Sequence, residues 1–211
     1  VAVVALLDEL TPAAKAIGAV NCVARQGDKL LGENTDGKGF LQSVQEHGPV
    51  TGKSALLLGA GGAARAVGVE LLRAGIGSIT VVNRSETRGR ELLEVLERVA
   101  PGKSQFVVWQ GDVAVPAGTD YVINCTSIGL FPDVNARVPL NFDTLKPGMI
   151  VCDVSPNPPR THLVREAEAR GCIALDGLGM LVNQGVIGIR LWTGQEPDPK
   201  VMRQALLDVF G

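Results

Sequence analysis

Three glycines in one short segment give the clearest chemical signal in the sequence. The apolar run Ser54–Leu58 leads into Gly59-Ala60-Gly61-Gly62-Ala63-Ala64, a G-x-G-x-x-A pattern between a predicted strand and a predicted helix. Gly59 permits a tight turn, Gly61 lets the backbone approach a pyrophosphate, and Ala64 lets the helix pack close to the strand. Free N–H groups at the helix start favour phosphate. An ordinary glycine turn is the alternative. The predicted cofactor-binding residues are Gly59, Ala60, Gly61, Gly62 and Ala63.

The end of the next predicted strand, at residues 79–82, indicates which dinucleotide is bound. Sites for NAD usually carry an acidic side chain there, which holds the ribose 2′-hydroxyl. This chain has Asn83-Arg84-Ser85 instead, and a guanidinium can pair with a 2′-phosphate through two hydrogen bonds. Arg88, one helical turn further on, adds positive charge. These four residues predict NADP as the cofactor, and the alternative is a solvent-exposed arginine at a helix start.

The order of the predicted elements gives the fold class that must position these residues. Strands alternate with helices of about ten to fifteen residues in the middle of the chain, which is typical of a parallel sheet covered on both faces. We predict an α/β protein with a Rossmann-type doubly wound parallel sheet, the NADP-binding domain, over residues 36–181. A second, incomplete α/β substrate lobe is expected from both chain ends, residues 1–35 and 182–211.

The two ends of the chain have a different pattern from the middle. Apolar spacing predicts helices at 1–10, 12–17, 180–192 and 200–210. Two short strands are predicted at 19–24 and 29–32, joined by the turn Gln26-Gly27-Asp28.

Composition and charge exclude several classes of function. The chain has 211 residues, of which 45% are hydrophobic, and a net charge of −2. Because its basic residues are scattered, neither nucleic acid nor a membrane surface is an expected partner. No apolar stretch approaches the ~20 residues that span a bilayer, and no signal peptide is visible, so a cytoplasmic location is predicted. Four separated cysteines and two histidines predict reduced thiols and no metal site.

Several segments together resemble the shikimate dehydrogenase family, in its order and spacing, over nearly the whole chain. They are IGAVN at 17–21, GENTDGKG at 32–39, GAGGAAR at 59–65, NRS at 83–85, NCTSIG at 124–129 and DGLGMLVNQG at 176–185. The resemblance implies an oxidoreductase that transfers hydride reversibly between NADPH and the ring ketone of 3-dehydroshikimate, giving shikimate. Such a step belongs to chorismate and aromatic amino-acid biosynthesis, and its partner is a small-molecule substrate.

The resemblance also implies roles for individual side chains. Asp36 matches a catalytic aspartate that holds a proton-donating lysine and hydrogen-bonds the substrate, although by itself Asp36 would be interpreted as a helix N-cap. Asn21 and Gln184 match residues that bind substrate hydroxyls, and amides can both donate and accept there. The residues that match the family's remaining cofactor contacts are Thr126, Ser127 and Gly177.

The lysine of the family's catalytic pair has no counterpart in this sequence. Aligning residues 8–11 with the family places that lysine immediately before Val1. The serine-bearing opening strand of the family is also missing, so the sequence is expected to lack the opening part of a full enzyme. None of Lys15, Lys29 and Lys38 matches the catalytic position.

Two departures from the family pattern concern the substrate. Asn21-Cys22 stands where the family has V-N-T, and Pro156 stands where it has a tyrosine near the substrate and nicotinamide. Two alternatives to a shikimate dehydrogenase therefore stay open. One is a quinate/shikimate dehydrogenase with relaxed substrate choice, and the other is a nucleotide-binding module without catalysis.

Overall fold

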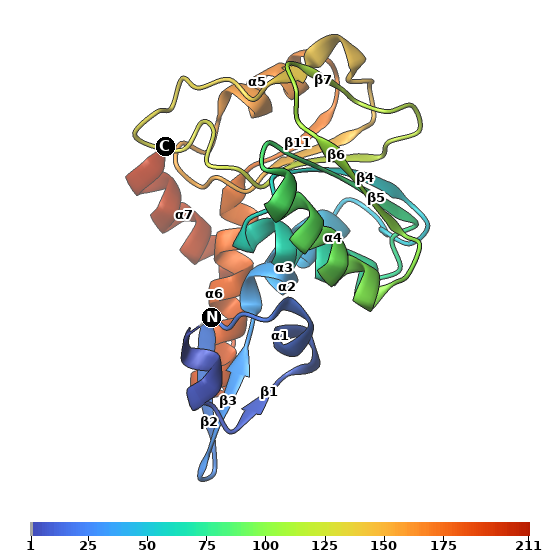
Figure 1. Cartoon of the computed structure of the whole chain (residues 1–211). Helices are drawn as coiled ribbons and strands as arrows, with labels where there is room; N and C mark the ends of the chain where they lie inside the picture. The colour runs from blue at the N-terminus through green and yellow to red at the C-terminus, as the bar shows by residue number, and fades with distance from the viewer. Residues whose placement is uncertain (1) are drawn as a thin grey trace.

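The computed structural model describes residues 2–211, and its larger region is built on a six-stranded parallel sheet (Figure 1). The strand order is β11-β10-β8-β4-β5-β6. The strands are β4 (Ser54–Leu58), β5 (Ser78–Asn83), β6 (Ser104–Val108), β8 (Tyr121–Asn124), β10 (Ile150–Asp153) and β11 (Ile173–Leu175). Every residue of β8 and β10 is buried, as expected for central strands of a sheet covered on both faces.

Helices cover both faces of this sheet. Helices α3 (Gly62–Arg73) and α4 (Glu86–Val99) supply one hydrophobic core, and α5 (His162–Ala169) supplies a second core that includes Leu163 and Ala167. The chain proceeds from β4 through β5 to β6 in one direction and from β8 through β10 to β11 in the other. This doubly wound arrangement confirms the predicted fold class, and the direction reverses between β4 and β8.

A small sheet of order β1-β3-β2 forms the other region. Its elements are η1 (Ala2–Leu6), β1 (Glu9–Leu10), α1 (Pro12–Ile17), β2 (Cys22–Gln26) and β3 (Lys29–Glu33). Helix α6 (Gly177–Thr193) runs from the large sheet to this small one, and α7 (Pro199–Phe210) packs on it (Figure 1). The indole N–H of Trp192 donates to the Val23 carbonyl at 2.9 Å, so both chain ends meet here.

The helix predicted over residues 1–10 is wrong, apart from Val1, which lies outside the described residues. Residues 2–6 form a 3-10 helix, and Glu9–Leu10 is a strand parallel to β3. Pairing with β3 takes the backbone groups a helix would use, because the Asp8 N–H donates to Leu30 and the Thr11 N–H to Gly32. The missing side chain at Gly32 leaves space for Leu7 and Leu10.

Helix α2 (Thr35–Gln45) connects the two regions and packs on both α3 and α6. The predicted domain boundaries fall in the first turn of α2 and within α6, and they stay a prediction. The remaining elements are β7 (Val113–Ala114), β9 (Leu140–Asn141) and η2 (Phe142–Thr144). Within residues 2–211, no helix combines the length and apolar character needed to cross a membrane.

Candidate functional site

The glycine-rich turn lies at the point where the strand order reverses. It follows β4, and the segment Cys125–Thr126 follows the neighbouring strand β8. Gly59 has a φ of 104°, and a β-carbon there would lie 3.0 Å from Thr126 Cγ2 and 3.1 Å from the Cys125 carbonyl oxygen. Only glycine fits both the backbone conformation and the space. Ligands of open α/β sheets bind at such a position.

Gly61 and Gly62 differ from Gly59 because their surroundings are open. A β-carbon at either residue would meet no atom within 4 Å, and both residues are exposed. Gly61 caps α3 without a side-chain hydrogen bond, so the first N–H groups of the helix remain available. Open space in front of free N–H groups fits the pyrophosphate of a dinucleotide.

The segment predicted to bind the 2′-phosphate joins β5 to α4. Ser85 is the N-cap of α4, and its hydroxyl accepts from the Arg88 N–H at 3.4 Å. The Asn83 amide donates to the Ser85 carbonyl at 2.8 Å, which fixes the turn. Arg84 and Arg88 are exposed, and within residues 2–211 neither guanidinium has an ion-pair partner. Both can therefore reach an anion at the strand end.

A buried polar network, which sequence reasoning missed, holds the loop after β8. The Asn124 side chain accepts from the Thr126 hydroxyl at 2.7 Å and donates to Asp153 at 3.1 Å. Asp153, 2% exposed, also accepts from the Thr161 hydroxyl at 2.8 Å. Burial raises the pKa of Asp153, and its hydrogen bonds partly oppose that rise. The network fixes Thr126 and leaves Ser127 exposed. The network could have been predicted from Asn124 and Asp153, polar residues that end two buried strands.

Gly177, the first residue of α6, is buried rather than open. A β-carbon there would lie 2.5 Å from the Ser155 carbonyl group. Close backbone packing between α6 and the segment after β10 therefore requires glycine at this position. Its predicted contact with the cofactor stays a prediction.

A second group of polar side chains comes from three distant segments, and we call Asn21, Thr35, Asp36 and Gln184 the polar cluster. The Asn21 side chain accepts from the Thr35 backbone N–H through Oδ1 at 2.8 Å. It also donates to the Thr35 hydroxyl through Nδ2 at 3.1 Å. The Thr35 hydroxyl lies 3.3 Å from Gln184 Oε1. The structure thus links Asn21 and Gln184 through Thr35, the neighbour of Asp36, to which no role was assigned from the sequence.

Asp36 is not the helix N-cap. Asn34 is the N-cap of α2, because its side chain accepts from the Gly37 N–H at 3.4 Å. Asp36 lies in the first turn and is half-buried, and burial raises the pKa of its carboxyl, while hydrogen bonding by Asn21 partly opposes the rise. No lysine or arginine among residues 2–211 forms an ion pair with it. Lys38 is bound to Glu33, and Lys29 to Glu9.

Two glycines of the D-G-x-G pattern let α2 approach its neighbours. A β-carbon at Gly37 would lie 2.4 Å from the Ala66 carbonyl oxygen of α3. One at Gly39 would lie 2.6 Å from the Gln184 backbone nitrogen and 2.7 Å from the Met180 carbonyl oxygen. The first contact packs the start of α2 against the middle of α3, and the second packs it against α6 beside Gln184.

The backbone leading to Asp36 is anchored by Glu33, which is 4% exposed. One carboxylate oxygen accepts from the Thr11 hydroxyl and the Asn34 N–H, each at 2.8 Å, and the other pairs with Lys38. A buried carboxylate needs this set of donors. Glu33 therefore fixes the segment that carries the polar cluster.

Fold and site together define a dinucleotide-binding α/β protein with a polar side-chain cluster where α2, α6 and the segment before β2 meet. Comparison with known proteins assigns the family. Residues 42–127 match the family model for shikimate / quinate 5-dehydrogenase, and residues 177–207 match that for the shikimate 5′-dehydrogenase C-terminal domain. A shikimate dehydrogenase (NADP(+)) of Desulforamulus reducens is 39% identical over 208 residues, which cover 97% of this chain and 72% of the relative.

Two solved structures show the same fold. The 5-ketofructose reductase of Gluconobacter sp. strain CHM43 is 47% identical with a TM-score of 0.95, and the match covers 100% of this chain and 76% of that one. The shikimate 5-dehydrogenase of Thermus thermophilus, in complex with NADP(H) and shikimate, is 36% identical with a TM-score of 0.81 and coverages of 98% and 74%. The chain belongs to the shikimate dehydrogenase family and is an oxidoreductase, as predicted.

Proposed function

We propose that this protein interconverts a hydroxyl and a ketone on a polyhydroxylated ring, with shikimate and 3-dehydroshikimate as its substrate pair. The observation that carries the proposal is the polar cluster. Asn21 and Gln184 offer amide donors and acceptors next to the Asp36 carboxylate, and such groups suit a substrate with several neighbouring hydroxyls. In the balanced reaction, shikimate and NADP⁺ give 3-dehydroshikimate, NADPH and a proton.

NADP is the cofactor. Relatives carry it in their names, and a solved relative holds NADP(H) together with shikimate. In this chain the open turn at Gly61 and Gly62 would receive the pyrophosphate, and Arg84 and Arg88 would pair with the 2′-phosphate. When bound, the nicotinamide supplies or accepts the hydride.

Asp36 has the chemistry to orient the reacting hydroxyl. An ionised carboxylate accepts a hydrogen bond from a substrate hydroxyl and stabilises positive charge on a neighbouring proton donor. Partial burial of Asp36 strengthens both interactions, because the local dielectric is lower than in water. Asn21 and Gln184 would then fix the ring through its remaining hydroxyls.

A second candidate substrate is 5-ketofructose, a polyhydroxylated ketone without the shikimate ring. The reductase named for it is 47% identical to this chain, against 39% and 36% for the two shikimate enzymes above. Pro156, in the place of the family's tyrosine, removes an aromatic ring and a hydroxyl from the substrate side. The higher identity favours a substrate like that of the reductase, and Pro156 favours one that needs no tyrosine contact.

Steady-state kinetics of a protein that carries the family's catalytic lysine, followed by NADPH absorbance, would test the proposal. The substrates are shikimate and quinate in the oxidative direction and 3-dehydroshikimate and 5-ketofructose in the reductive direction, each with NADP(H) and NAD(H). We expect the highest kcat/KM for the shikimate pair with NADP(H). A higher kcat/KM for 5-ketofructose would establish the second candidate, and NADP binding without turnover of any substrate would indicate a binding module.

A further inference from the structure

A cavity of about 390 Å³ opens at the end of the α2–α6 contact that lies away from the polar cluster. The two helices run antiparallel, because Gly39 lies against Gln184 whereas Ser43, further along α2, lies against Gly179. Thr35 and Ser43 are eight residues apart, or about 12 Å along the helix. The cavity is therefore separate from Asp36, although the same two helices line it.

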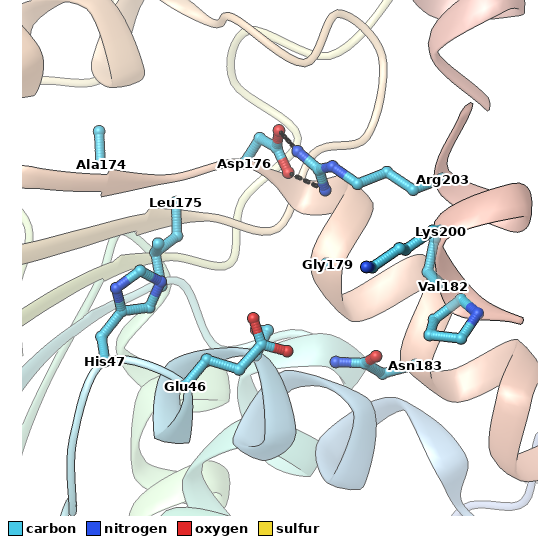
Figure 2. Close-up of a pocket in the computed structure, with 12 residues that line it drawn as sticks. Glu46, His47, Ala174, Leu175, Asp176, Gly179, Val182, Asn183, Lys200 and Arg203 are labelled. Atoms are coloured by element: carbon cyan, nitrogen blue, oxygen red, sulfur yellow. Dashed lines mark hydrogen bonds and ion pairs between the residues drawn. The ribbon is translucent and has the colours of Figure 1, made fainter. Parts of the chain in front are cut away.

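Two of the four charged side chains around the cavity neutralise one another. The Arg203 guanidinium forms two hydrogen bonds with Asp176, one of them 3.1 Å long (Figure 2). Asp176 is also the N-cap of α6 and accepts from the Leu178 N–H at 3.1 Å. Arg203 and Asp176 therefore form one wall of the cavity as a neutral pair.

The other two charges, on Glu46 and Lys200, are unmatched. Figure 2 shows the Glu46 carboxylate directed into the cavity from the end of α2 and the Lys200 ammonium from α7. Within the described part of the chain, neither side chain has an ion-pair partner. Lys200 lies in the first turn of α7, where the helix dipole disfavours a cation and favours an anion. The Asp198 carboxylate already caps this helix, accepting from the Lys200 N–H at 2.8 Å, so a bound carboxylate would pair with the Lys200 ammonium alone.

Hydrogen-bond acceptors lie across the cavity from the Arg203–Asp176 pair (Figure 2). The Asn183 amide donates to the Gly39 carbonyl at 3.3 Å, which turns its carbonyl oxygen toward other donors. With the Glu46 carboxylate, it offers acceptors suited to an ammonium group. The rest of the lining includes the apolar side chains Leu175, Val182 and Pro199.

We propose that this cavity binds a free α-amino acid with an apolar side chain. Its carboxylate would pair with Lys200, its ammonium with Glu46 and Asn183, and its side chain would cover Leu175 and Val182. The net charge of the four charged groups is zero, so a zwitterion is matched better than a simple anion or cation. The cavity, at about 390 Å³, has room for one amino acid of the size of leucine or phenylalanine.

Isothermal titration calorimetry of the chain with L-phenylalanine tests this site. We expect saturable binding with a Kd below about 1 mM. Phenylpropionate, which lacks the ammonium group, and phenethylamine, which lacks the carboxylate, should each bind at least about tenfold more weakly, since each loses one charge-assisted contact. Glycine, which lacks the apolar side chain, should also bind more weakly.

Substitutions of the lining residues test whether L-phenylalanine binds in this cavity. Glu46→Gln and Lys200→Met should each weaken L-phenylalanine by about tenfold or more, whereas Glu94→Gln, on the exposed face of α4, should leave it unchanged. A thermal melt of each variant confirms that it is folded. Absence of saturable binding at about ten times the expected Kd, equal binding by the two analogues, or wild-type affinity in both cavity variants would overturn the proposal.

Discussion

The glycine turn and the polar cluster, which we propose to bind cofactor and substrate, present their polar groups in opposite ways. The turn uses backbone alone: Gly61 and Gly62 leave space, and the start of α3 supplies N–H groups. The cluster uses side chains from the segment before β2, from α2 and from α6, so it exists only when those elements are packed together. A local site thus depends on a few consecutive residues, whereas an assembled site depends on the packing of the whole protein.

The largest expected effect tests the assembled site at its carboxylate. In a protein that carries the family's proton-donating lysine, Asp36→Asn should lower turnover by about 10²- to 10⁴-fold, because the amide keeps the shape but cannot supply the charge. Thermal stability and NADP affinity should hardly change, since Asn34 caps the helix and the glycine turn lies on other elements. Steady-state kinetics, a melt and a cofactor titration of the same variant separate these effects. Near-normal turnover would remove Asp36 from the catalytic account.

The local site should respond through affinity rather than turnover. Arg84→Asp should weaken NADP binding by about ten- to a hundredfold, the worth of a charged hydrogen bond, and should change NAD binding little. Arg98→Asp, in the last turn of α4, makes the same charge change away from the turn and serves as the control. Fluorescence titration with both cofactors measures the ratio. An unchanged preference for NADP over NAD in Arg84→Asp would contradict the assignment of Arg84.

Packing that assembles the cluster should be sensitive to a single methyl group. Gly39→Ala forces a β-carbon against backbone atoms of Gln184 and Met180, so we expect a loss of about 1–3 kcal/mol in unfolding free energy together with reduced turnover. Gly62→Ala meets no atom within 4 Å and should not destabilise the protein. Chemical denaturation compares the two. Equal stability of the two variants would show that α2 and α6 need no close contact.

Glu70, on the side of α3 that packs against Gly37 of α2, should give the smallest effect. Burial raises the pKa of its carboxyl, and Oε1 has no hydrogen-bond partner among the described residues. A raised folded-state pKa means that stability is highest when the group is protonated, at acid pH, and is lost as the pH rises through that pKa. Glu70→Gln should therefore stabilise the protein by about 1 kcal/mol near neutral pH, with the gain disappearing in acid. A gain independent of pH would contradict this origin.

Features set by neighbouring residues could be predicted from the sequence, whereas features assembled from distant segments could not. The strand–turn–helix around Gly59 follows from local spacing and was predicted closely. The strand Glu9–Leu10 was not predicted, because its partner strand lies more than twenty residues away in the sequence. The residues near Glu9 give no information about that pairing. Thr35 and Asp153 were missed for a related reason, since their partners meet them only in the folded chain.

A crystal structure of the protein with NADP and shikimate bound together tests the central claim, that the glycine turn and the polar cluster serve one reaction. We predict that the pyrophosphate lies against Gly61 and Gly62 and that shikimate hydroxyls contact Asp36, Asn21 and Gln184. The nicotinamide C4 should then lie about 3–3.5 Å from the ring carbon that carries the reacting hydroxyl. Shikimate bound away from the polar cluster, or a nicotinamide directed away from Asp36, would contradict the account.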